Sequence, residues 1–180
     1  MDIRYIVGQG FGILAVALGF ISFQIRSQKG LMAVQIAVAV SFCLHFYMID
    51  VPTAFAMNAF CVVRNVAYLN RGRKWLSSPL IPVVFAAIMA LIGVISWKGW
   101  YSVLLVIPLS VNTYCMSFRE ARHIRMSILF TSPPMLLYNV FVFSIGGFVY
   151  QTMIITSSAI GLIRDAKSRK RESDDASGDE

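Results

Sequence analysis

Seven apolar runs follow one another along the chain, at residues 6–24, 31–49, 51–69, 80–97, 100–118, 124–145 and 147–163. Each run is close to the ~20 residues that an α-helix needs to cross a 30 Å hydrocarbon core. Apolar residues make up 57% of the chain and charged residues only 14%, so the chain cannot cover these runs with a polar surface of its own. The sequence therefore predicts an all-α, polytopic membrane protein with seven transmembrane helices.

The composition changes abruptly after residue 163. Residues 164–180 hold five Lys/Arg and six Asp/Glu with almost nothing apolar, which predicts a disordered cytoplasmic tail. The expected organisation is a first triple-helix bundle at 1–70, a cytoplasmic loop and linker helix at 71–98, a second triple-helix bundle at 99–163, and the tail at 164–180. This is a 3+1+3 arrangement of two parallel bundles.

The basic residues predict the orientation in the membrane. Seven crossings place only Arg4 and Lys98 on the side of the N-terminus and leave Arg64 inside the third run. The other thirteen fall on the opposite side: Arg26, Lys29, Arg71, Arg73, Lys74, Arg119, Arg122, Arg125, Arg164, Lys167, Arg169, Lys170 and Arg171. Because positive residues are enriched in cytoplasmic loops, we expect the N-terminus outside and the C-terminus in the cytoplasm.

An internal repeat supports the division into bundles. A shift of 93 residues lays the first three runs over the last three without a gap, and Asn58 then falls on Gln151 and Asn65 on Ser158. The fourth run has no partner and is plainly apolar, as a linker helix would be. One extra crossing gives the two bundles the same orientation, and transporters with such parallel repeats bind substrate near the midplane between them.

Short motifs in these runs resemble two known groups of membrane proteins. Asn58-Ala59-Phe60, followed by Asn65 and Tyr68, is similar to the third-helix pattern of the SWEET and PQ-loop superfamily, whose layout is also two triple-helix bundles. SWEET proteins carry kinking prolines in both bundles, whereas this chain has no Pro-Gln pair and places Pro108, Pro133 and Pro134 all in the second bundle.

A closer resemblance is to the YgjV-type family of bacterial inner-membrane proteins. It lies in Gly8-Gln9-Gly10, His45-Phe46 and Asn58…Arg64-Asn65, and covers most of residues 5–165. The resemblance implies a bacterial inner-membrane location.

Four uncharged polar residues inside the runs lead the candidate binding residues. Asn58 and Asn65 lie on one face of a helix, and Gln151 and Ser158 repeat their spacing. Amides and hydroxyls at this depth suit a small polar solute because they exchange hydrogen bonds with it. The alternative is that they only hydrogen-bond neighbouring helices. With parallel repeats, we expect Asn58 and Gln151 to approach each other across the central axis.

Three further residues complete the predicted substrate-binding set. One interpretation of Arg64 is that its aliphatic part lies along the helix and its guanidinium reaches the cytoplasmic interface. The alternative is that it forms a cationic gate or a contact for an anionic substrate. His45 and Tyr138 occupy equivalent positions of the repeat; His45 either makes a structural hydrogen bond or couples a proton.

The function that these features favour is a facilitator that moves a small polar solute by alternating access. The alternative is a non-transporting membrane scaffold or accessory subunit. The sequence holds no HExxH, GxSxG or paired carboxylates, so we expect no enzyme. Its three cysteines form no CxxC pair, so we expect no metal and no cofactor. The expected partners are the lipid bilayer, a small polar solute and, as an open alternative, a second copy of the chain, with no nucleic acid.

Overall fold

The computed structural model describes residues 3–22, 28–70, 78, 80–115 and 121–177, which form α-helices and no strand. The helices follow the order α1 (Ile3–Ser22), α2 (Gln28–Met48), α3 (Pro52–Leu69), α4 (Leu80–Ile95), η2 (Trp100–Ser102, a 3₁₀ turn), α5 (Val103–Cys115), α6 (Ala121–Phe141) and α7 (Ile145–Ser177). The seven α-helices match the seven apolar runs in order and number.

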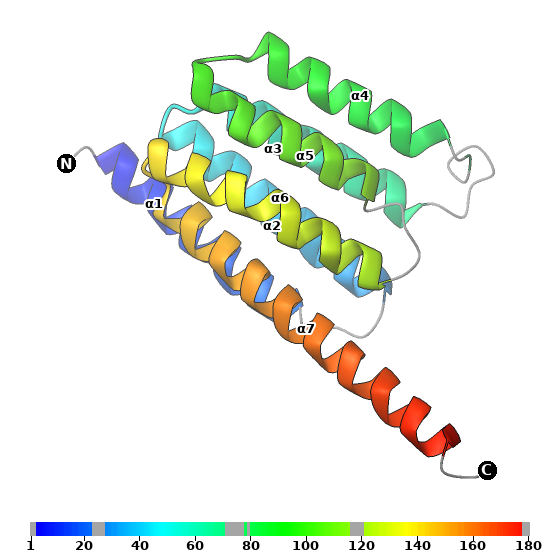
Figure 1. The fold of residues 1–180 in the computed structure, drawn as a ribbon. Helices are drawn as coiled ribbons and strands as arrows, with labels where there is room; N and C mark the ends of the chain where they lie inside the picture. Colours follow the sequence, from blue (N-terminus) through cyan, green and yellow to red (C-terminus); the bar gives the residue numbers. More distant parts are fainter. Residues whose placement is uncertain (1–2, 23–27, 71–77, 79, 116–120, 178–180) are drawn as a thin grey trace.

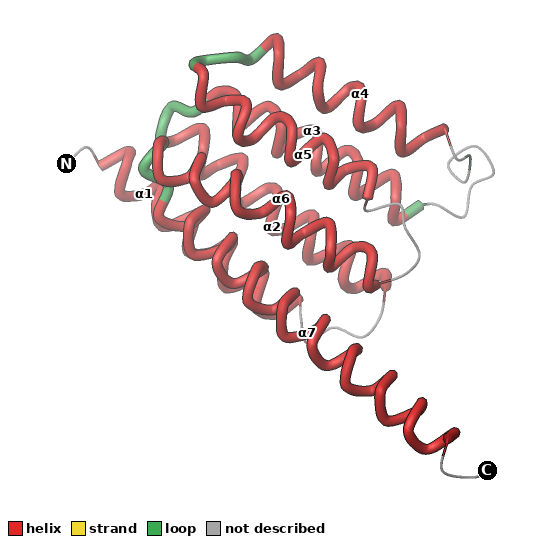
Figure 2. Tube along the Cα trace, in the orientation of Figure 1, coloured by secondary structure: helices red, strands yellow, loops and turns green. Residues whose placement is uncertain are grey.

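The helices run back and forth between two ends of one bundle (Figure 1). The α2–α3, α4–α5 and α6–α7 connections lie at the same end as the start of α1 (Figure 2). Because of this alternation, consecutive helices are antiparallel, and α1–α3 point the same way as α5–α7.

Much of the basic charge predicted for the other end, at Arg26, Arg71, Arg73, Lys74 and Arg119, lies outside the described residues.

Two boundaries differ from the sequence prediction. The last helix does not end at residue 163: α7 continues to Ser177 and runs past the end of the bundle (Figure 1), where the sequence predicted a disordered tail. No glycine or proline occurs between Arg164 and Ser177 to interrupt the helix. The segment also contains Ala, Lys, Arg and Glu, which favour helix, so α7 continues through it. The fifth run begins with the 3₁₀ turn η2 before α5 starts at Val103.

Only two helices among the described residues are both long and apolar enough by themselves to cross a membrane. They are Ile3–Ile21 in α1 and Ile145–Arg164 in α7. Shorter apolar helices lie at Ala33–Met48, Leu80–Ile95 and Trp100–Cys115. α4 has 16 residues, or about 24 Å of helix, which is shorter than a hydrocarbon core.

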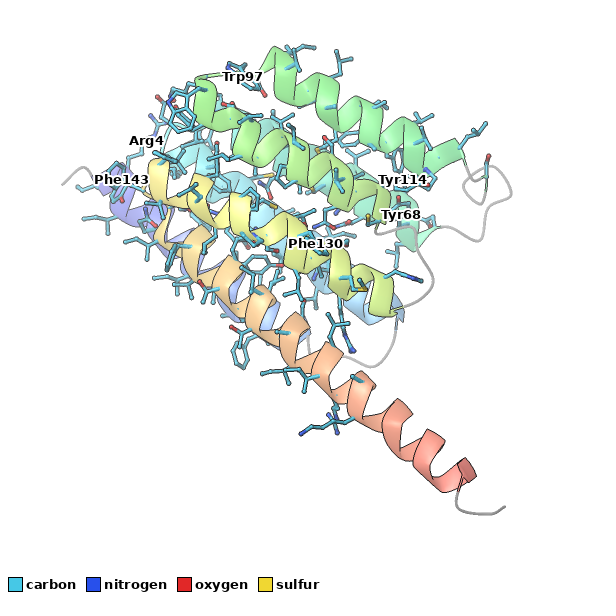
Figure 3. All side chains as sticks on the ribbon, in the orientation of Figure 1. Arg4, Tyr68, Trp97, Tyr114, Phe130 and Phe143 are labelled. Carbon is cyan, nitrogen blue, oxygen red and sulfur yellow. The ribbon has the colours of Figure 1, made fainter. Side chains whose placement is uncertain are left out.

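The outer surface is nevertheless apolar around the bundle. Large hydrophobic side chains project from every helix; Phe130 in α6 and Phe143 after it, both labelled in Figure 3, are 77% and 75% exposed. A water-soluble protein rarely exposes so many apolar side chains together. This surface fits a lipid environment.

Each helix packs on its neighbours in the chain, and α1 also packs on α7, so the helices close into a ring. The α1–α7 contact is very close because glycines meet there. A Cβ built at Gly12 would lie 3.1 Å from the Cα of Gly146 and 3.1 Å from the ring of His45. α3 and α5 have no comparably extensive contact, since both pack on α4.

The turns after α2 and α6 repeat each other at the 93-residue shift. Asp50 and Phe143 are equivalent positions, and both have positive φ, 57° and 52°, as the residue that ends a helix in a Schellman-type turn does. The hydrogen bonds Ile49 N→His45 O, Val51 N→Phe46 O and Phe55 N→Val51 O recur as Val142 N→Tyr138 O, Ser144 N→Asn139 O and Phe148 N→Ser144 O. The sequence repeat is therefore also a repeat of backbone geometry.

The contacts between the halves are reciprocal as well. The hydroxyl of Tyr5 donates to the carbonyl of Phe143 at 3.0 Å, and the ammonium of Lys98 donates to the carbonyl of Asp50 at 2.7 Å. Tyr5 and Lys98 are 93 positions apart, as are Asp50 and Phe143. When residue i contacts j and the equivalent of i contacts the equivalent of j, the two units are related by a two-fold axis.

Candidate functional site

A cavity of about 180 Å³ lies between α2, α3, α5, α6 and α7. Neither α1 nor α4 contributes a side chain to its lining. Twelve of the lining residues form equivalent pairs at the 93-residue shift: Gln35/Ile128, Ala39/Ser132, Phe42/Met135, Phe46/Asn139, Asn58/Gln151 and Cys61/Ile154. The repeat therefore builds most of the cavity wall, and it does so with both halves.

The structure brings four of the predicted binding residues to this cavity: Asn58, Arg64, Asn65 and Gln151. The Asn58 amide donates to the carbonyl of Ala54, one turn earlier, at 2.8 Å. The Gln151 amide lies 3.8 Å from the sulfur of Met135, a weak acceptor. Asn58 and Gln151 thus meet one cavity from opposite halves and spend little of their hydrogen-bonding capacity on strong protein partners.

Arg64 is a buried residue of the cavity wall, with 7% of its surface exposed. Its Nε and Nη2 both donate to Asn65 Oδ1, at 3.2 and 3.1 Å, and its Nη1 donates to Thr113 Oγ1 at 2.9 Å. The alternative in which this side chain extends to the interface is therefore wrong. Arg64 instead turns inward and connects α3 to α5.

The other three predicted residues are buried but do not line the cavity: Ser158, His45 and Tyr138. His45 bonds the carbonyl of Gly8 through Nδ1 at 2.8 Å and the hydroxyl of Ser144 through Nε2 at 2.6 Å. Because a carbonyl only accepts, Nδ1 carries the proton and the Ser144 hydroxyl donates to Nε2. His45 therefore makes structural hydrogen bonds that join α1 and α2 to the turn before α7.

The sequence prediction missed several polar residues of the wall: Gln35, Asn112, Ser132, Asn139 and Tyr150. The amide oxygens of Asn112 and Asn139 are buried and have no hydrogen-bond partner. The 93-residue shift could not have marked Ser132 and Asn139, because it pairs them with the apolar residues Ala39 and Phe46.

No group of three or more His, Cys, Asp or Glu side chains in the described part of the chain could hold a metal ion. Cys43, Cys61 and Cys115 are free thiols. The cavity therefore offers amides, hydroxyls and one guanidinium, which suit reversible hydrogen bonding.

An all-helical bundle with an apolar exterior and several polar side chains around an interior cavity is typical of helical membrane proteins. Residues 6–169 match the family model Imp-YgjV, described as bacterial inner membrane protein, and the chain belongs to this family. The resemblance to the YgjV-type family is thereby confirmed. No curated protein and no solved structure matches the chain.

Proposed function

We propose that the chain crosses the inner membrane seven times, with the N-terminus outside and the tail in the cytoplasm, as two parallel bundles, α1–α3 and α5–α7, joined by α4. The alternation of helix direction supports this topology, and the repeated turns and reciprocal contacts support the pairing of the bundles. Short helices such as α4 reach across where flanking residues and local thinning make up the difference.

Reporter fusions test the topology. A reporter that is active only in the cytoplasm should be active after residue 180 and silent after residue 98. The opposite pattern would overturn the orientation, and activity at both positions would overturn the number of crossings.

Within this frame, the protein is a facilitator for a small polar solute, which it carries by alternating access between the two bundles. The observation that carries the proposal is the cavity: both halves contribute polar side chains to its wall, and the equivalent residues Asn58 and Gln151 both line it. Polar groups facing lipid would stay unpaired at a cost of several kcal/mol each, so their natural partners are water or solute. A scaffold would need no such cavity, and it is the weaker explanation.

Uptake into proteoliposomes tests the transport proposal. Asn58→Leu and Gln151→Leu should each abolish uptake of a small polar solute while leaving expression and thermal stability nearly unchanged. Thr152→Val is the matched control, because Thr152 is the neighbour of Gln151, is exposed, and bonds only within α7. Unchanged uptake in both cavity variants would overturn the proposal, and so would a loss in the control of the same size.

A further inference from the structure

The cavity wall carries one formal charge among the described residues. Of the lining side chains only Arg64 is of the Arg, Lys, Asp, Glu or His type. Its hydrogen-bond partners among the described residues, Asn65 and Thr113, are neutral. A buried cation whose partners are all neutral strongly favours an anion beside it, because the desolvated charge is otherwise uncompensated.

The unused donors and acceptors of the wall residues indicate which groups a ligand must present. A guanidinium has five N–H donors, and three of those on Arg64 are taken by Asn65 and Thr113, which leaves two. Elsewhere on the wall, the amide oxygens of Asn112 and Asn139 accept from no protein group. A complementary ligand therefore presents an acceptor group to Arg64 and a donor group to an asparagine oxygen.

We propose that the ligand of this cavity is a small 2-hydroxycarboxylate, with its carboxylate on Arg64 and its hydroxyl donating to Asn112 or Asn139. The inference names the substrate class of the proposed facilitator and so rests on that function. A planar carboxylate is the acceptor that a guanidinium fits best.

Charge balance separates this ligand from its closest relatives. A monocarboxylate leaves the wall neutral, an amino-acid zwitterion leaves it with the uncompensated charge of Arg64, and a neutral polyol does the same. A divalent anion leaves one negative charge. Size points the same way: since a cavity of about 150 Å³ holds benzene, about 180 Å³ suits a ligand of lactate size with a few waters.

Binding to the purified full-length protein in lipid-free detergent tests the inference without any transport step. Thermal stabilisation is titrated with L-lactate, its neutral amide lactamide, propionate, L-alanine and inorganic phosphate. Lactate should bind at least about tenfold more tightly than lactamide, because a hydrogen bond to a charged group is lost with the carboxylate. Propionate, which lacks the hydroxyl, should bind more weakly than lactate. Lactamide or phosphate binding as tightly as lactate would overturn the proposal.

Variants then assign the contact. Arg64→Gln should reduce lactate affinity about tenfold or more and lactamide affinity much less, because a neutral carbonyl bonds the guanidinium more weakly than a carboxylate does. The control Arg164→Gln, which removes an exposed charge, should alter neither. An equal loss for both ligands in Arg64→Gln would overturn the assignment. If Arg64→Gln does not fold, the ligand series on the unaltered protein decides alone.

The two proposals fail differently. Selective lactate binding without uptake would uphold the ligand class and overturn the facilitator. Uptake of neutral solutes that is insensitive to lactate and to Arg64→Gln would uphold the facilitator and overturn the ligand class.

Discussion

The two halves of the molecule, α1–α3 and α5–α7, share a backbone plan and differ in chemistry. Both end their second helix in the same turn, with positive φ at Asp50 and at Phe143. Yet the position equivalent to Arg64 is Ser157, and the positions equivalent to Asn112 and Asn139 are Gly19 and Phe46. The first half therefore supplies the cation, and the second half supplies the unpaired amide oxygens.

The two seams between the halves differ in the same way. At the α1–α7 seam Gly12 meets Gly146, and the backbones touch. The equivalent positions at the α3–α5 side are Leu105 and Thr53, which carry side chains, and the contact between these two helices is less extensive. Both α3 and α5 contribute side chains to the cavity wall, whereas at the α1–α7 seam only α7 does. The repeat thus sets the backbone plan, and the residues at equivalent positions decide how closely the helices at each seam pack.

The largest effect is expected at the closed seam. In Gly146→Ala the new Cβ would fall on the backbone of Gly12, which cannot move aside as a side chain could, so we expect a loss of about 3 kcal/mol of stability. Thermal unfolding of the purified protein in detergent measures it. Gly10→Ala is the matched control, because no atom lies within 4 Å of its Cβ position, and it should be neutral or slightly stabilising. Equal behaviour of the two variants would mean that the halves do not touch at Gly146.

The next effect concerns His45 and Tyr138, which are equivalent positions but differ in their hydrogen bonds. His45→Phe leaves the carbonyl of Gly8 and the hydroxyl of Ser144 without their buried partner. We expect it to cost about 2–3 kcal/mol in the same unfolding measurement. A cost near zero would show that the contacts from His45 to α1 and to the turn contribute nothing to the closed seam.

Tyr138→Phe, at the position equivalent to His45, should do the opposite. The Tyr138 hydroxyl is buried and has no hydrogen-bond partner, so its removal takes away an unsatisfied polar group. We expect a gain of about 1 kcal/mol, measured beside His45→Phe. A loss as large as that of His45→Phe would contradict the difference between the two halves at this level.

The smallest effect compares the two turns. Phe143→Gly relieves a positive φ that a bulky residue tolerates poorly, and it should stabilise the protein by up to about 1 kcal/mol. Asp50→Gly should gain less, since Asp tolerates this conformation better and its carboxylate lies 3.4 Å from Lys98. A shift in unfolding temperature that is larger for Asp50→Gly would reverse this ranking.

Much of the fold follows from the order of residues. The number and order of helices could be predicted from apolar runs because the hydrocarbon core fixes the length of a crossing segment. The 93-residue repeat predicted which positions correspond, and the cavity wall follows that correspondence at Asn58 and Gln151. The extension of α7 to Ser177 was missed, because the charged composition that suggested disorder is also compatible with helix.

The chemistry of the site depended on packing that no pattern contains. Sequence alone determined that apolar helices fold back and forth and that two similar triplets are present, because hydrophobic runs and spacing are local properties. Only the tertiary structure decided that Arg64 turns inward onto Asn65 and Thr113 and that His45 bonds Ser144. It also decided that the amide oxygens of Asn112 and Asn139 have no partner. A side chain's hydrogen-bond partners come from other helices, and which helices those are is set only when the ring closes.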